Sequence, residues 1–255
     1  QLKINFPDAH FRLGNAQQLK GSLNAAITAY KTAIQLKHDF PDAHNNLGAA
    51  FQERGNLNAA IASYKTALRL KPDFLEAHVN CGNALKDKYC LIGAMAAYEE
   101  ALQLKPDSPE AHNGIGCVHK EKNELTRAII SFKKAIRLKP NYPEAFNNLG
   151  NALKDKDDLT AAIASYKTAI QLRPKFADAY NNLGVALQEN SNLTSAIASF
   201  NKAIELEPDN SEAHLYSSLA MLLNGEYEKG WEKYEWRNMQ KGTVSTIHAV
   251  PNCKL

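Results

Sequence analysis

Asparagine recurs in this sequence at a spacing that suits a binding surface. A first row repeats at steps of 34 residues, with Arg12 and Gly114 interrupting it, and a second row lies three residues further along in some copies. The first row is Asn46, Asn80, Asn148 and Asn182, and the second row is Asn15, Asn83 and Asn151. A carboxamide both donates and accepts hydrogen bonds, so a row of carboxamides can pair with the backbone of an extended polypeptide whatever its side chains. These seven residues are the candidate peptide-binding site; the alternative is that they bond neighbouring copies of a repeat to one another.

Histidine recurs at the same step, and this column raises the question of a metal site. Its members are His10, His44, His78, His112 and His214. One histidine per copy would place successive rings about 8–10 Å apart, the spacing of packed helices, which is too far for one ion to bridge. Phe146 and Tyr180 occupy the same column, which favours a flat ring that packs. We therefore expect no metal and no cofactor.

No arrangement of residues in the sequence indicates catalysis. A nucleophile beside a base, a phosphate-binding loop and a metal cluster are all missing from the pattern. The four cysteines form no CxxC pair and lack the spacing of a zinc site. We expect a non-catalytic protein of the reducing cytoplasm.

The charge pattern gives little reason to expect a nucleic acid or a membrane as partner. The formal net charge is +3 and the pI is about 8.5, which is mild. Lysines recur at Lys31, Lys65, Lys133, Lys134 and Lys167, but a solvated helix face explains them. No apolar run approaches the roughly 20 residues of a membrane helix. An RNA-binding helical repeat would require a basic concave face, and here acidic and basic residues alternate.

A repeat of 34 residues positions both asparagine rows. Its markers are a glycine column, two alanine columns, an aromatic column and a closing proline. The glycine column is Gly14, Gly48, Gly82, Gly116, Gly150 and Gly184, and the aromatic column is Tyr30, Tyr64, Tyr98, Phe132, Tyr166 and Phe200. The first alanine column is Ala26, Ala60, Ala94, Ala128, Ala162 and Ala196, and the second is Ala33, Ala67, Ala101, Ala135, Ala169 and Ala203. Small residues at the glycine and first alanine columns are expected to face each other, while the aromatic ring fills the gap between copies.

Each copy is predicted to fold as two antiparallel helices. In the second copy the first helix covers Pro41 to Arg54 and the second runs from about Leu57 to Leu70. Glycine at the turn between them, as at Gly55, suits a left-handed backbone. The third copy has Tyr89 there, so we expect a distorted turn. Capping boxes are predicted at the starts of the first helices, for example Asp39 with Asp42.

These columns resemble the tetratricopeptide-repeat (TPR) family, and the resemblance covers residues 7 to about 240. It implies an all-α fold, a right-handed TPR superhelix or α-solenoid of antiparallel helix hairpins, with the first helix of each hairpin on the concave side. It also implies that the function is binding a protein or an extended peptide. Six complete units are predicted at 7–40, 41–74, 75–108, 109–142, 143–176 and 177–210. Residues 211–240 form a divergent seventh unit that acts as a cap.

The asparagine rows resemble the substrate-binding groove of O-linked N-acetylglucosamine transferases. The tail from Gly230 to Leu255 is similar to the junction in bacterial proteins whose repeats precede a glycosyltransferase-like domain. An alternative function is therefore a substrate-presenting arm, with a catalytic domain beyond Leu255. TPR co-chaperones that clamp a terminal carboxylate use a lysine just before the asparagine position, and no unit here has that lysine.

Both ends of the sequence carry expectations of their own. Residues 1–6 align with the closing segment at 35–40 and are predicted to be the tail of a preceding repeat. Trp231, Tyr234 and Trp236 crowd the seventh unit, where we expect aromatic rings to cover the end of the core. A docking face for a following domain is the alternative. Residues 241–255 are expected to be a linker or the start of another element.

Overall fold

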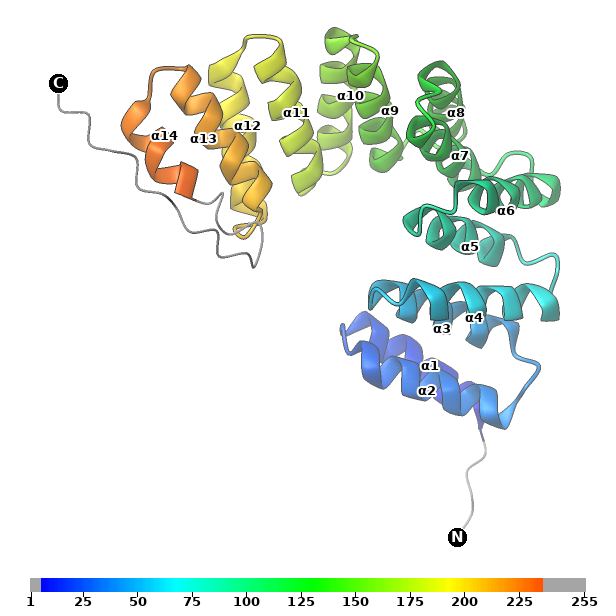
Figure 1. Cartoon of the computed structure of the whole chain (residues 1–255). Helices are drawn as coiled ribbons and strands as arrows, with labels where there is room; N and C mark the ends of the chain where they lie inside the picture. The colour runs from blue at the N-terminus through cyan, green and yellow to red at the C-terminus, as the bar shows by residue number, and fades with distance from the viewer. Residues whose placement is uncertain (1–5, 236–255) are drawn as a thin grey trace. The chain divides into compact units, whose positions relative to one another are not determined.

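A computed structural model describes residues 6–235 of the chain. These residues form fourteen α-helices and no strand (Figure 1). The helices are α1 (Pro7–Leu19), α2 (Leu23–Leu36), α3 (Pro41–Glu53), α4 (Leu57–Leu70), α5 (Leu75–Asp87), α6 (Leu91–Leu104), α7 (Pro109–Glu121), α8 (Leu125–Leu138), α9 (Pro143–Asp155), α10 (Leu159–Leu172), α11 (Ala177–Glu189), α12 (Leu193–Leu206), α13 (Ser211–Leu223) and α14 (Tyr227–Tyr234). We call the odd-numbered helices A helices and the even-numbered helices B helices. The predicted all-α hairpin fold is confirmed, and none of these helices has the length and apolar character needed to cross a membrane.

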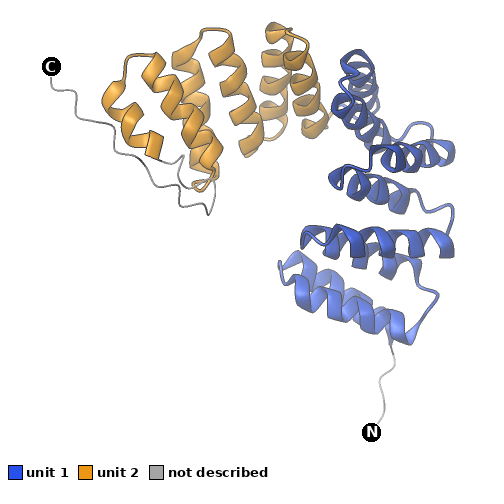
Figure 2. Cartoon of the chain, viewed as in Figure 1, with its two compact units in different colours: residues 1–140 blue, residues 141–255 orange. Residues whose placement is uncertain are grey.

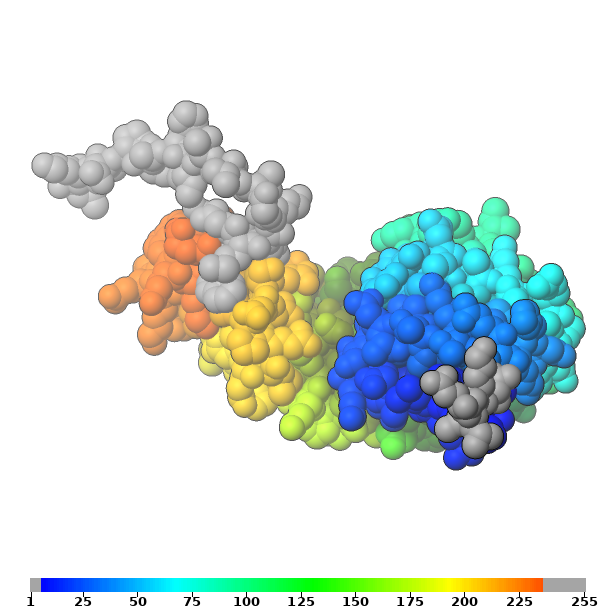
Figure 3. All heavy atoms as spheres, turned by 90° about the horizontal axis from the view of Figure 1, so that it is seen from below, coloured from blue at the N-terminus to red at the C-terminus, as the bar shows by residue number. Residues whose placement is uncertain are grey.

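The chain divides into two compact units, residues 1–140 and residues 141–255 (Figure 2). Within each unit, an A helix packs against its own B helix, and that B helix packs against the next A helix. In the first unit the atoms of successive hairpins lie in direct contact (blue and cyan, Figure 3). Each hairpin therefore depends on its neighbours for a complete core, as expected of a solenoid.

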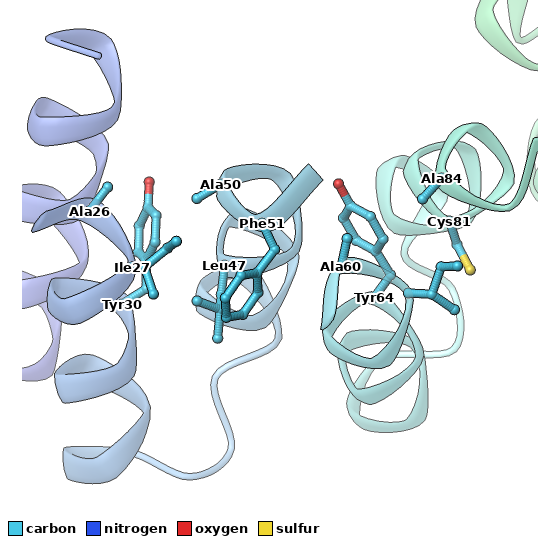
Figure 4. Packing of buried hydrophobic residues seen from close by; sticks show 11 residues of the cluster. Ala26, Ile27, Tyr30, Leu47, Ala50, Phe51, Ala60, Tyr64, Cys81 and Ala84 are labelled. Atoms are coloured by element: carbon cyan, nitrogen blue, oxygen red, sulfur yellow. The ribbon is translucent and has the colours of Figure 1, made fainter. Parts of the chain in front are cut away.

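The core is built from the alanine and aromatic columns. Tyr30, Phe132 and Phe200 are completely buried, and both alanine columns are also inaccessible to solvent. Figure 4 shows Tyr30 and Tyr64 between successive helices, with their hydroxyl groups on the same side. A Cβ atom added at Gly48 would lie 2.6 Å from Tyr64 Cε1. The glycine column therefore makes room for the ring of its own hairpin.

The turn between A and B helices keeps one geometry, whichever residue occupies it. Gly55 has a φ of 80° and Tyr89 has a φ of 59°, both in the left-handed region. In each turn the amide of this residue donates to the carbonyl three residues earlier, at 2.9 Å for Gly55 and 2.8 Å for Tyr89. The next amide donates to the carbonyl five residues earlier, at 2.8 Å in both turns. The predicted distortion at Tyr89 is wrong, because the two flanking helices fix the turn and the tyrosine adopts the backbone conformation they impose.

The predicted capping boxes are also wrong. The N-cap of α3 is Phe40, whose side chain accepts no cap hydrogen bond, and Asp39 precedes it. The side chains of Ser108 and Asn210 do cap A helices, by accepting from the amides of Ala111 and Ala213. The predicted capping residues lie one position before the N-cap. In several A helices the N-cap itself is an aromatic residue, and proline follows it as the first helical residue.

The seventh hairpin buries small residues at two positions where it departs from the repeat. Ser218, in the glycine column, is fully buried, and Gly230 is buried against Leu222. Trp231 packs edge-on against Tyr234 at a ring-centroid distance of 5.6 Å but stays 58% exposed. The capping role of residues 211–240 stays a prediction. Trp236, like residues 1–5 and the expected linker, lies outside the described residues.

Candidate functional site

The seven candidate asparagines all lie on A helices. Asn15 belongs to α1, Asn46 to α3, Asn80 and Asn83 to α5, Asn148 and Asn151 to α9, and Asn182 to α11. Every one of them is half-buried, so each keeps part of its carboxamide accessible to solvent. Residues three positions apart share a helix face, so the two rows lie side by side on α5 and α9.

Asparagines of the first row donate hydrogen bonds to the preceding A helix. Asn46 Nδ2 donates to Asn15 Oδ1 at 2.9 Å, so the structure brings two predicted site residues together directly. Two others donate to asparagines that we did not predict, Asn80 to Asn45 Oδ1 at 3.1 Å and Asn182 to Asn147 Oδ1 at 3.0 Å. These bonds support the alternative role of joining neighbouring repeats. Each uses one of the two amide hydrogens, so a second hydrogen is left for a ligand.

Asn45 is the centre of this network in the first unit. Its side chain is 1% exposed, donates to Glu76 Oε1 at 3.2 Å and to Asn46 Oδ1 at 3.3 Å, and accepts from Asn80. The sequence contains a signal for this role, because asparagine recurs at 45, 113, 147 and 181 at steps of 34 residues. A carboxylate clamp would have lysine in this column, and here its asparagine bonds neighbouring repeats instead.

The second row holds the tyrosine hydroxyls of the core. Asn15, Asn83 and Asn151 each accept from the tyrosine of their own hairpin, at 2.8, 2.7 and 2.7 Å respectively. In two of the hairpins that lack this asparagine, the ring is phenylalanine, which has no hydroxyl to donate. Cys117 and Val185 accompany Phe132 and Phe200, and Tyr64, opposite Ala49, uses Gln52 Oε1 at 3.0 Å instead. The hydrogen bond to the tyrosine of the same hairpin thus explains why asparagine occurs in the second row.

The first row is interrupted at Gly114, where the ring of Tyr98 fills the space that a side chain would need. A Cβ atom added at Gly114 would lie 2.3 Å from Tyr98 Cζ. An asparagine could not enter there unless the ring moved. At the seventh hairpin Tyr216 stands at the first-row position. Asn181 Oδ1, whose residue is only 6% exposed, correspondingly accepts no hydrogen bond from any residue between 6 and 235.

A pocket of about 580 Å³ opens on this surface in the first unit. It is lined by Asn15, Gln18, Leu19, Tyr30, Asn46, Ala49, Glu53 and Glu76. The pocket joins one asparagine of each row, which hydrogen-bond to each other. A smaller pocket of about 270 Å³ is lined by Lys86, Asp87, Tyr89 and Glu121, near the C-terminal ends of α5 and α7.

Charges along the A helices are partly neutralised by internal ion pairs. Lys86 pairs with Asp87 at 3.0 Å, and Lys154 lies 3.4 Å from Asp155 and 3.8 Å from Glu189. The expected balance of charge holds at these positions. The larger pocket differs, because its lining contains two glutamates and no lysine or arginine.

The histidine column bonds the loops that precede the A helices. The Nε2 atoms of His78, His112 and His214 donate to the carbonyl oxygens of Pro72, Pro106 and Pro208, at 2.8, 3.0 and 2.9 Å. Each imidazole thereby ties a helix start to the loop before it. Across the described part of the chain, no three histidine, cysteine, aspartate or glutamate side chains come together as a metal site would require.

Comparison with protein families finds matches along most of the chain. A TPR repeat model matches residues 19–55, 51–88, 91–123, 118–157 and 150–191, and a tetratricopeptide repeat model matches residues 177–210. No curated protein matches by sequence.

Several solved structures share the architecture. A chain of the APC/C hetero-tetramer Cut9–Hcn1 has a TM-score of 0.78 at 18% identity over 86% of this chain, which spans 43% of that chain. PilF of Pseudomonas aeruginosa has a TM-score of 0.67 at 20% identity, with 83% and 96% of the two chains covered. At these identities the likeness shows the fold alone. YrrB, described as a TPR protein with an unusual peptide-binding site, has a TM-score of 0.50 at 25% identity, with 72% and 95% covered.

Proposed function

Because this chain belongs to the tetratricopeptide-repeat family, we propose that it is a non-catalytic scaffold that binds an extended polypeptide segment along its A helices. The observation that carries the proposal is the pocket of about 580 Å³ on α1, α3 and α5, which contains Asn15 and Asn46. A pocket lined by one asparagine from each row suits a polypeptide backbone, which presents alternating donors and acceptors. The peptide-binding site named for YrrB supports a similar use of this fold.

The hydrogen bonds inside the network define what the asparagines can offer a ligand. Asn46 uses one amide hydrogen on Asn15, and its Oδ1 accepts from Asn45. Asn15 Oδ1 accepts from both Tyr30 and Asn46, so its amide group is the part that remains for a ligand. Both side chains are held in place by these internal bonds, so little side-chain entropy is lost on binding. We therefore expect the asparagines to act mainly as donors to backbone carbonyl groups.

Replacing the first row tests the proposal. We expect the variant with Asn46, Asn80, Asn148 and Asn182 all changed to alanine to bind its peptide about tenfold or more weakly, because several backbone hydrogen bonds are lost together. The probe is a fluorescently labelled peptide selected on the wild-type protein from a random display library, and affinity is measured by titration calorimetry. Unchanged affinity would refute the groove.

A matched control separates binding from folding. These asparagines also join neighbouring A helices, so their loss is expected to lower stability. The control variant changes four exposed lysines of the B helices to alanine, namely Lys31, Lys65, Lys133 and Lys167. Far-UV circular dichroism at the titration temperature must show equal helicity for both variants. The lysine variant is expected to bind the peptide as the wild type does.

The remaining predictions concern properties that the matched residues leave open. The glycosyltransferase arm stays an alternative, since the family matches end at residue 210 and contain repeats only. A nucleotide-sugar-binding domain encoded after Leu255 would favour it. The cytoplasmic location and the absence of a nucleic-acid partner also stay predictions; salt-dependent RNA binding in a shift assay would contradict the latter.

A further inference from the structure

The pocket of about 580 Å³ differs from the rest of the A-helix surface in its charge. Glu53 on α3 and Glu76 on α5 contribute carboxylates from two different hairpins. The other lining residues are neutral, namely Asn15, Gln18, Leu19, Tyr30, Asn46 and Ala49. The pocket therefore carries two negative charges and no positive charge in its wall.

Equivalent positions in the other hairpins show how the charge of this pocket differs from theirs. Glu53 belongs to an acidic column that continues at Asp87, Glu121, Asp155 and Glu189. The preceding residue is lysine in the third to fifth hairpins, and Lys86 and Lys154 form ion pairs with members of this column. In the second hairpin the preceding residue is Gln52, which donates to Asp87 at 2.9 Å instead. Glu53 thus lacks the lysine that the third to fifth hairpins provide, and no ion pair of Glu53 is found among residues 6–235.

Both carboxylates accept hydrogen bonds from side-chain amides, which are neutral and leave their negative charge uncompensated. Gln18 Nε2 donates to Glu53 Oε1, and Asn45 Nδ2 donates to Glu76 Oε1 at 3.2 Å. The second oxygen of each carboxylate accepts no hydrogen bond from any residue between 6 and 235. The negative charge of the two glutamates affects nearby groups. The pKa of Tyr64 is raised chiefly by burial and in addition by nearby negative charges, which include Glu53 and Glu76. Both glutamates are exposed, so their carboxylate oxygens can accept hydrogen bonds from a ligand.

We infer that this pocket receives an arginine or lysine side chain of the bound polypeptide. The inference rests on the proposed groove, because the backbone beside that side chain would lie on Asn15 and Asn46. A volume of about 580 Å³ accommodates a long side chain, and a cationic head group supplies the charge that the pocket wall lacks. Carboxylate oxygens from two hairpins suit arginine in particular, because its planar guanidinium presents five N–H donors.

A double-mutant cycle between protein and peptide tests the inference. Peptides are selected on the wild-type protein from a random display library, and we expect arginine or lysine at one register. Citrulline, the neutral isostere of arginine, is then placed at that register. The change is expected to weaken binding to the wild type about tenfold and to the variant E53Q/E76Q less than about twofold. The matched control, E205Q, alters an exposed glutamate of α12 and should keep the full tenfold loss.

The outcomes distinguish this inference from the groove. If citrulline weakens binding equally in the wild type and in E53Q/E76Q, or if the selected peptides lack a basic register, the cationic pocket is wrong. The groove then still stands if the first-row alanine variant loses affinity. If arginine and the two glutamates are coupled but the first-row variant binds normally, the pocket stands and the asparagine groove is wrong. Failure to select any peptide overturns both.

Discussion

One substitution at two glycines tests the packing that underlies the whole array. Gly48 lies in α3 and Gly93 in α6, and both have ordinary helical backbones. A Cβ atom at Gly48 would lie 2.6 Å from Tyr64 Cε1 and 2.7 Å from Cδ1, far inside van der Waals contact. At Gly93 the nearest atom would be Leu85 Cδ1 at 3.5 Å, an ordinary contact. Alanine is therefore expected to destabilise the first site and to stabilise the second.

The magnitudes follow from the surroundings of each glycine. Tyr64 is 1% exposed and its hydroxyl donates to Gln52 at 3.0 Å, so the ring cannot turn away without breaking that bond. Such overpacking costs about 3 kcal/mol, at the upper end of its usual range. The higher helix propensity of alanine offsets about 1 kcal/mol of this. We expect G48A to lose about 2 kcal/mol of stability and G93A to gain up to about 1 kcal/mol.

The assay has to resolve individual hairpins, because repeat arrays need not unfold in one step. Native-state hydrogen exchange reports the opening free energy of α3 and α6 separately, and urea unfolding followed by circular dichroism reports the whole chain. If G48A is as stable as the wild type, or if both substitutions shift stability in the same direction, the assignment of the glycine column to ring packing is wrong.

Three further predictions concern single residues. Tyr89→Gly is expected to raise stability by about 1 kcal/mol in urea unfolding, since a tyrosine that is 78% exposed gains little from packing and its φ of 59° favours glycine; a loss would show that the ring is held by contacts. Phe200→Tyr is expected to raise the free energy of unfolding by about 1 kcal/mol in the same assay. The reason is that Gln188 Oε1 is buried without a hydrogen-bond partner in residues 6–235, and the new hydroxyl would donate to it. Equal stability of the variant and the wild type would contradict this. Burial raises the pKa of Tyr64 and Tyr166, so above pH of about 10 the unfolded chain releases protons that the folded chain retains, and stability should fall by about 1.4 kcal/mol per pH unit per tyrosine. Unfolding curves at successive alkaline pH values check this, and a Tyr→Phe change at either site should make the decline shallower.

The sequence was sufficient for the helices and the columns of the core. Pro41, Leu57 and Leu70 were predicted as helix ends and are helix ends in the structure. This works because a packed repeat imposes the same restriction on equivalent positions, so each column is sampled six times within one chain. The capping boxes and the turn at Tyr89 failed for a related reason: both rested on local propensity, which the fixed hairpin geometry overrides.

The asparagine rows were located correctly on the A helices, but their internal partners were not predicted. A periodic pattern places Asn83 on a helix face and does not reveal that the hydroxyl of Tyr98, fifteen residues later, reaches it. The sequence does show phenylalanine in place of tyrosine in two hairpins whose second-row position lacks asparagine. This pattern can be interpreted only when the second-row position and the aromatic column are known to be in contact. Asn45 was missed because it adjoins Asn46 in the chain, and only the packed structure distinguishes the buried member from the accessible one.

Two kinds of hydrogen bond in this array have different consequences for duplication of its repeats. The bond between Tyr166 and Asn151 lies within one hairpin, so a copied hairpin brings both partners with it. The bond from Asn182 to Asn147 needs a neighbour that supplies the acceptor, and most hairpins do. Interior hairpins can therefore multiply without losing buried hydrogen bonds. The seventh hairpin differs, since Tyr216 stands in place of the donor and Asn181 Oδ1 before it has no hydrogen-bond partner among residues 6–235. A copy of this hairpin placed between two others would therefore lose the bond that asparagine supplies elsewhere in the array.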